Sequence, residues 1–120
     1  AGRNGVRGKT MTQPKRLVEG SQLGTSVATF YTAPANTRTR ILLVTVTNTT
    51  GTAQTVTLHL VAPGGSASAS NMVTSARNVA AGQSVVLYEA AHNLESAGSI
   101  QALASAGTAL TLMASGVEFS

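Results

Sequence analysis

The chain has 120 residues, a length typical of one domain, and 42% of them are hydrophobic. It contains no cysteine, which excludes a disulfide framework and a cysteine-based zinc site. It also contains no aspartate, and charged residues make up 10% of the chain, so most catalytic triads and thiol mechanisms are excluded. We therefore expect a protein without enzymatic activity, cofactor or metal. No apolar run reaches the length of about 18 residues that a membrane span requires, so we expect no membrane partner.

The net charge of +4 is concentrated near the N-terminus. Five basic residues and no acidic residue lie within residues 1–16: Arg3, Arg7, Lys9, Lys15 and Arg16. This segment has few hydrophobic residues, so it cannot bury enough apolar surface to offset the entropy that it would lose on ordering. We predict a flexible basic arm over residues 1–16, followed by a β domain over residues 17–120.

Two classes of partner fit a basic arm. It can neutralise the phosphates of nucleic acid, or it can lie across an acidic protein surface; a tail without any role is the third reading. The rest of the chain has no basic stripe and no aromatic platform for stacking bases, which argues against nucleic acid. We give equal weight to docking on a protein surface and to the absence of any role. The five basic residues are the candidate partner-binding site.

After the arm, apolar and polar residues alternate with a period of two, which is typical of strands with one buried face. Turn residues interrupt this alternation about every ten residues. The expected strands cover, in chain order, residues 17–18, 26–32, 38–48, 54–62, 77–79, 85–88, 100–105 and 109–119. Residues 90–98 are compatible with one or two helical turns that end at Gly98.

The two central strands, residues 38–48 and 54–62, are predicted to form a hairpin with one buried and one polar face. The expected buried face comprises Leu42, Val44, Val46, Val56, Leu58 and Leu60. His59 then falls on the polar face, exposed or at an interface. In the last strand, Gly116 is predicted to mark a bulge that turns Val117 and Phe119 inward.

The turn spacing and the seven to eight short antiparallel strands predict an all-β fold, a β-sandwich or jelly roll with an extended N-terminal arm. A helix in the last third is the rival interpretation, because alanine, leucine and methionine favour helices. The threonine and glycine residues between 107 and 116 argue against that helix.

One group of titratable residues has a spacing that could carry chemistry. Glu89, His92 and Glu95 are three residues apart, so they would share one side of a helical turn. A carboxylate and histidine pair that binds iron in helical bundles normally occurs twice, with further carboxylates. Here the pair occurs once, in an all-β chain, and we interpret it as a surface turn.

Six segments carry a more specific pattern. They are residues 31–37 (YTAPANT), 41–51 (ILLVTVTNTTG), 56–61 (VTLHLV), 81–85 (AGQSV), 100–102 (IQA) and 110–118 (LTLMASGVE). Together, over Val27 to Phe119, they resemble a recurrent small all-β virion protein of tailed bacteriophages, most closely a capsid decoration (cement) protein. The basic arm is not part of the pattern.

The resemblance implies a structural protein that assembles on the outer surface of the virion after synthesis in the host cytoplasm. It would bind the major capsid protein and stabilise the shell, as a homo-oligomer, dimer or trimer, with the arm tying neighbouring capsid subunits together. Related modules occur in phage tails and fibres, so a tail, neck or fibre component is the alternative. A carbohydrate-binding or adhesive β-sandwich module is the second alternative.

Overall fold

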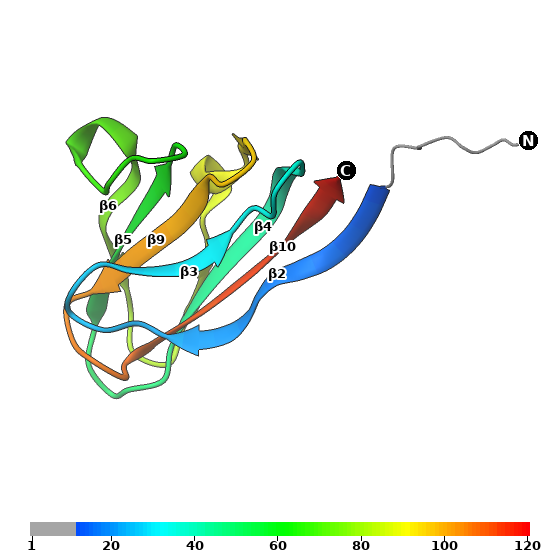
Figure 1. The fold of residues 1–120 in the computed structure, drawn as a ribbon. Helices are drawn as coiled ribbons and strands as arrows, with labels where there is room; N and C mark the ends of the chain where they lie inside the picture. The colour runs from blue at the N-terminus through cyan, green and yellow to red at the C-terminus, as the bar shows by residue number, and fades with distance from the viewer. Residues whose placement is uncertain (1–11) are drawn as a thin grey trace, which may run out of the picture.

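The computed structural model describes residues 12–120, which contain nine strands and two short 3-10 helices (Figure 1). The strands are β2 (Thr12–Gln22), β3 (Ala28–Thr32), β4 (Arg38–Asn48), β5 (Gln54–Val61), β6 (Met72–Val79), β7 (Ser84–Val86), β8 (Asn93–Leu94), β9 (Ser99–Ala104) and β10 (Leu110–Phe119). The 3-10 helices are η1 (Ala69–Asn71) and η2 (Tyr88–Ala90). Neither helix of this described part has the length and apolar character needed to cross a bilayer.

The strands form two antiparallel sheets that enclose the core between them. One sheet has the order β2-β10-β4-β7, and the two-residue strand β8 also pairs with β4. The other sheet has the order β3-β9-β5-β6. The chain passes repeatedly between the sheets, so most strands pair with strands that are distant in sequence, as in double-sheet jelly rolls. The predicted β-sandwich is confirmed, and the strand order makes it a jelly roll.

Aliphatic side chains from both sheets fill the interior. Val46 on one sheet and Leu58 and Ile100 on the other are fully buried, and β10 adds Leu110 and Leu112. Each such side chain stabilises the fold by about 1.5–3 kcal/mol through removal of apolar surface from water. The alternation along β4, β5, β9 and β10 is therefore the sequence feature that builds the core.

The first strand includes part of the predicted arm. Residues 1–11 lie outside the described residues, and β2 begins at Thr12. Residues 12–16 pair with residues 115–119 of β10. Strand β2 thus begins inside the segment expected to be the arm, because backbone pairing with β10 orders residues that have little apolar surface of their own.

A β-bulge at Leu42 breaks the alternation of β4. On β10, Ser115 pairs with Leu43 and the next residue, Gly116, pairs with Ile41, so Leu42 is an extra residue on β4. Ile41 therefore points inward and is 1% exposed, whereas Leu42 is 56% exposed. The prediction that Leu42 lies on the buried face is wrong for this reason.

Gly116 lies opposite this bulge, where the backbones approach closely. A β-carbon at this position would overlap the carbonyl oxygen of Arg40 and lie 2.9 Å from Cδ1 of Leu17. The glycine thus marks a bulge as predicted, but the extra residue is on the neighbouring strand. Val117 is half-buried and Phe119 is 37% exposed, so the expected inward turn of Phe119 is wrong.

The predicted hairpin of residues 38–48 and 54–62 is also wrong, since β4 and β5 lie in opposite sheets. Val44, Val46, Val56 and Leu58 are buried as expected and Leu60 is half-buried, but the two strands meet across the core rather than side by side. The buried Asn48 fixes the crossing between them. Its Nδ2 donates to the carbonyl oxygens of Thr52 (2.8 Å) and Val79 (2.9 Å), and its Oδ1 accepts from the backbone N–H of Thr50 (2.9 Å).

Residues 90–98 do not form the predicted helical turns. The short helix η2 ends at Ala90, and β8 then pairs with β4. The backbone N–H of Ala97 donates to the carbonyl of Ala33 at 3.0 Å, and the N–H of Ala33 donates to the carbonyl of Gly98 at 2.8 Å. Bonds to a distant segment of the chain thus replace the local bonds of a helix.

His59 is 4% exposed, so the expectation that it is exposed on the polar face is wrong. Its Nδ1 lies 2.9 Å from Oδ1 of Asn71, in the segment that contains η1. Asn71 also donates from Nδ2 to the carbonyl of Ser66, and it accepts from the backbone N–H of Ser68. The loop after β5 therefore folds back over His59 and buries it.

A polar bridge joins the two sheets at the end where β10 finishes. The Tyr31 hydroxyl of β3 lies 2.7 Å from Oγ1 of Thr39 on β4 and donates to Oε2 of Glu118 on β10 at 2.5 Å. Nζ of Lys15 on β2 lies 3.6 Å from the same carboxylate oxygen. Burial, and then the bond to Glu118, raise the pKa of Tyr31 to about 12.

Candidate functional site

The outward surface of the five-stranded sheet, here called the outer sheet face, collects side chains from five strands. The strand register defines its rows. Arg40 on β4 lies between Val117 on β10 and Asn93 on β8. Two rows further along, Thr45 lies between Met113 and Val86. Residues far apart in sequence thus form one continuous surface.

The middle of the outer sheet face is apolar. We call Leu42, Leu43, Tyr88 and Met113 the apolar patch; their exposed fractions are 56%, 47%, 80% and 41%. The bulge projects Leu42 outward beside Leu43. Leu87 donates its N–H to the carbonyl of Val44, which places the next residue, Tyr88, level with Leu43. Exposed apolar groups gathered in this way mark protein interaction sites, and tyrosine and methionine are enriched there.

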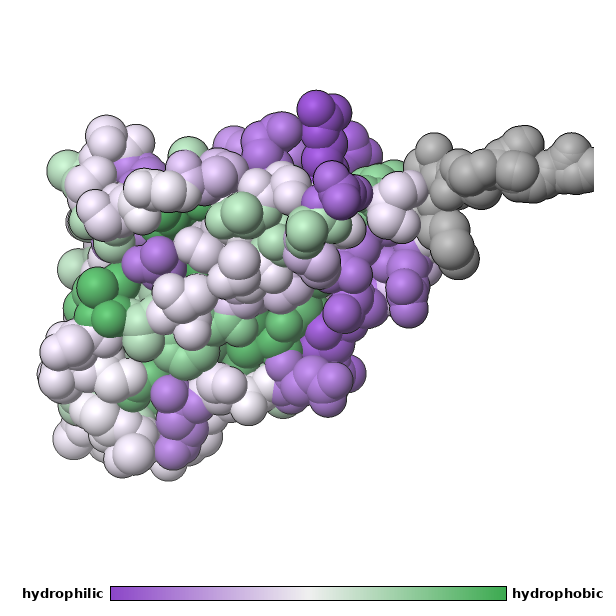
Figure 2. Space-filling model, in the orientation of Figure 1, coloured by the Kyte–Doolittle hydropathy of each residue, from purple (hydrophilic) through white to green (hydrophobic). Residues whose placement is uncertain are grey.

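The two ends of the outer sheet face differ in polarity. Hydrophilic residues gather at the end of the molecule where β2 begins and β10 ends, and the loops at the opposite end are close to neutral (Figure 2). Arg38 pairs with Glu95 at 3.2 Å at the hydrophilic end. Toward the other end, the hydroxyl oxygens of Thr47 and Ser84 lie 2.7 Å apart and share a hydrogen bond. The face therefore changes from charged to apolar to hydroxyl-lined along its length.

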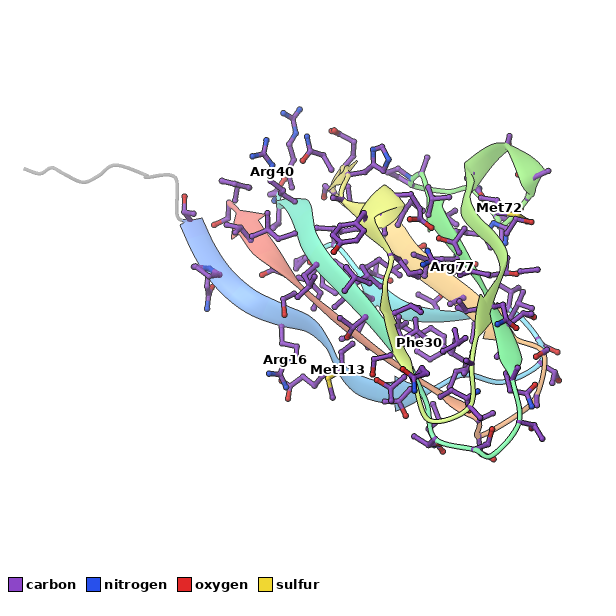
Figure 3. All side chains as sticks on the ribbon, turned by 180° about the vertical axis from the view of Figure 1, so that it is seen from behind. Arg16, Phe30, Arg40, Met72, Arg77 and Met113 are labelled. Atoms are coloured by element: carbon purple, nitrogen blue, oxygen red, sulfur yellow. The ribbon has the colours of Figure 1, made fainter. Side chains whose placement is uncertain are left out.

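Two of the five predicted site residues lie within the described residues, and one of them borders this face. In the strand register, Arg16 of β2 pairs with Ser115 of β10. The side chain of Arg16 lies beside that of Met113, which is also on β10 (Figure 3). Lys15 instead points toward Glu118 of the polar bridge. The other three predicted residues, Arg3, Arg7 and Lys9, lie outside the described residues.

The residues Glu89, His92 and Glu95 do not form one cluster. Glu89 lies 3.9 Å from Arg77 and accepts a hydrogen bond from Thr74 at 2.8 Å, whereas Glu95 pairs with Arg38. Within residues 12–120, no group of three or more histidine, aspartate or glutamate side chains is placed to hold a metal ion.

The β2 edge of the five-stranded sheet is less suited to pairing with another chain than the face is to packing. β2 is the long edge strand, and its register against β10 shifts twice. Pro14 lacks a backbone N–H, and Gly20 has a φ of 129°. A proline, basic residues and bulges are features that prevent edge-to-edge pairing. The outer sheet face is therefore a better candidate surface than the β2 edge.

No family model and no curated protein matches the sequence. A solved structure of Bacillus endospore appendages, described as disulfide-linked pili, is similar with a TM-score of 0.58 and 14% identity over 96% of this chain and 93% of that chain. The T13 viral particle of infectious bursal disease virus is similar with a TM-score of 0.57 and 8% identity over 92% of this chain and 31% of that chain.

The Gx strain of the same virus gives a TM-score of 0.53 and 16% identity over 92% of this chain and 32% of that chain. This chain thus spans about a third of the viral chains and nearly the whole of the pilus chain. At these identities the similarity establishes the fold, which this chain shares with proteins of two kinds of assembly.

Proposed function

We propose that this chain is a structural protein of a bacteriophage virion that binds the outside of the capsid through its outer sheet face and stabilises the shell. The observation that carries the proposal is the apolar patch, four large exposed side chains on one face of a jelly roll. The phage assignment comes from the sequence resemblance over Val27 to Phe119. No catalytic step is part of this role.

The surface fits attachment in many copies. Burial of an exposed leucine or methionine contributes about 1.5–3 kcal/mol, so a patch of this size gives a modest affinity for each single contact. Repetition on a shell lattice, or within a dimer or trimer, adds avidity to such contacts. The chain has no cysteine, so the proposed attachment uses no disulfide bond, unlike that of the disulfide-linked pili.

The basic residues extend this surface in the proposal. Arg16 borders the patch, and Arg3, Arg7 and Lys9 precede β2 in sequence. We propose that these basic residues bind acidic regions on neighbouring subunits of the major capsid protein.

A filament subunit, such as a phage tail component, is the second candidate. It is favoured by the pilus structure, whose chain this one matches over nearly its whole length. A carbohydrate-binding module receives less support, because Tyr31, one of the two tyrosines available for a sugar platform, is 9% exposed.

The test compares two methionines on purified particles. Met113→Ser removes an apolar group from the patch, while Met72→Ser removes one of similar exposure, 36% against 41%, from the other sheet. We expect Met113→Ser to lower the number of copies on the shell and Met72→Ser to leave it unchanged. Equal occupancy of the two variants contradicts attachment through this face. If the wild-type chain is instead found on the tail in only a few copies per particle, the second candidate is favoured.

A further inference from the structure

Arg40 differs from Arg38 and Arg77 in its charge partners. Arg38 pairs with Glu95 and Arg77 with Glu89, whereas Arg40 has no carboxylate partner within residues 12–120. Its Nε donates to Oδ1 of Asn93 at 3.3 Å. This bond orients the guanidinium group and leaves its two terminal amino groups for another acceptor.

The guanidinium borders a pocket of about 360 Å³. The lining residues are Arg40, Ile41, Leu42, Ala91, His92 and Asn93. The Leu42 bulge and the shortness of β8 make this hollow, and the N–H of Ile41 donates to the carbonyl of His92 at 2.9 Å, which fixes the opposite wall to β4. Leu42 belongs both to this pocket and to the apolar patch.

A second hollow of about 260 Å³ shares Arg40 and Asn93 with the first. Glu95 and Arg38 line it, and they are already paired with each other. Arg40 thus stands between two hollows at the border of an apolar surface, and it forms no ion pair with a carboxylate of residues 12–120.

We propose that this Arg40 pocket binds a carboxylate side chain of the partner protein, from a glutamate flanked by an apolar residue that packs on Leu42. The inference rests on the proposed function and specifies the partner's chemistry. The two terminal amino groups of an arginine can donate parallel hydrogen bonds to the two oxygens of a carboxylate, and Leu42 and Ala91 beside Arg40 offer apolar contact to the flanking residue. A phosphate of nucleic acid fits less well, because the adjoining surface is apolar and offers no stacked aromatic platform.

The direct test uses the full chain in solution and two capped peptides. The first peptide has a leucine beside a glutamate, and the second has a glutamine in place of that glutamate. Nuclear magnetic resonance titration is expected to shift the Arg40 Nε–H signal and the amide signals of residues 40–43 and 91–93 with the glutamate peptide. The glutamine peptide is expected to bind about tenfold more weakly, as is the glutamate peptide to Arg40→Ala.

Arg77→Ala, an exposed arginine on the other sheet, is the matched control and is expected to bind like the wild type. Arg40→Lys keeps the charge but loses the fork, and intermediate binding is expected. Equal shifts with both peptides, or shifts spread over the whole surface, would overturn the proposal. A single-stranded oligonucleotide that binds the pocket more tightly than the glutamate peptide would also overturn it.

A particle experiment separates this inference from the proposed function. If the chain is found on capsids and Arg40→Ala keeps full occupancy, the carboxylate pocket is wrong while the capsid role stands. If the chain is absent from capsids but the glutamate peptide binds at Arg40, the pocket stands and the capsid role fails.

Discussion

At the scale of single residues, Gly116 allows β4 and β10 to approach at the bulge. We predict that Gly116→Ala lowers the free energy of unfolding by about 2 kcal/mol or more, because the added methyl group would overlap the carbonyl of Arg40, which is backbone and cannot turn away. Urea denaturation measures the change. Gly51→Ala is the control, since nothing lies within 4 Å of the methyl group that it adds. Equal stability of the two variants would show that the close approach is absent.

Asn48 is the second residue on which the fold depends. Asn48→Ala removes the side-chain donor from the buried carbonyl group of Val79, together with the bond to the carbonyl group of Thr52, and we predict a loss of about 3 kcal/mol of unfolding free energy. The exposed Asn78 provides the control, and Asn78→Ala is expected to change stability by less than about 0.5 kcal/mol. A thermal unfolding midpoint of Asn48→Ala equal to that of Asn78→Ala would refute this role.

Tyr31 makes stability depend on alkaline pH. Its pKa is raised from 10.0 to about 12 in the folded chain, so between these values the unfolded chain releases a proton that the folded chain retains. The stability is complete below pH 10 and falls as the pH rises toward 12. In a Tyr88→Phe background, phenolate absorbance reports Tyr31 alone. A midpoint near 10 in the folded protein would contradict the buried bridge to Glu118.

At the scale of elements, the sequence predicted where strands lie better than how they pair. The strand expected over residues 38–48 is β4, Arg38–Asn48. Alternation defines which residues share a face, but it holds no information on whether two such strands are neighbours or face each other across a core. The bulge at Leu42 had no signal of its own, since a leucine fits either face, and it reversed the faces of Ile41 and Leu42.

The strand β2 separates the structural role of the N-terminal residues from their proposed binding role. Five of its eight pairings with β10 involve residues 12–16. We predict that deletion of residues 1–16 lowers the thermal midpoint, whereas deletion of residues 1–11 leaves it unchanged and still weakens attachment to capsids. Calorimetry and co-sedimentation with capsids measure the two effects. Full attachment after deletion of residues 1–11 would remove Arg3, Arg7 and Lys9 from the mechanism.

At the scale of the whole molecule, the fold class could be predicted and the candidate site could not. Turn spacing and period-two alternation were sufficient for an all-β sandwich. Arg40, Tyr88 and Met113 are separated by tens of residues, and only the strand register brings them onto one face. Their sequence signal was weak: a tyrosine after a short strand, and apolar residues at positions that alternation assigns to solvent.

The measurement that tests the central claim most directly is a cryo-electron microscopy reconstruction of the particle that carries this chain. We predict many copies on the outer shell, each with its five-stranded sheet toward the capsid and with Leu43, Tyr88 and Met113 buried in the contact. A reconstruction in which the outer sheet face remains open to solvent, or in which the chain is absent from the shell, would contradict the account.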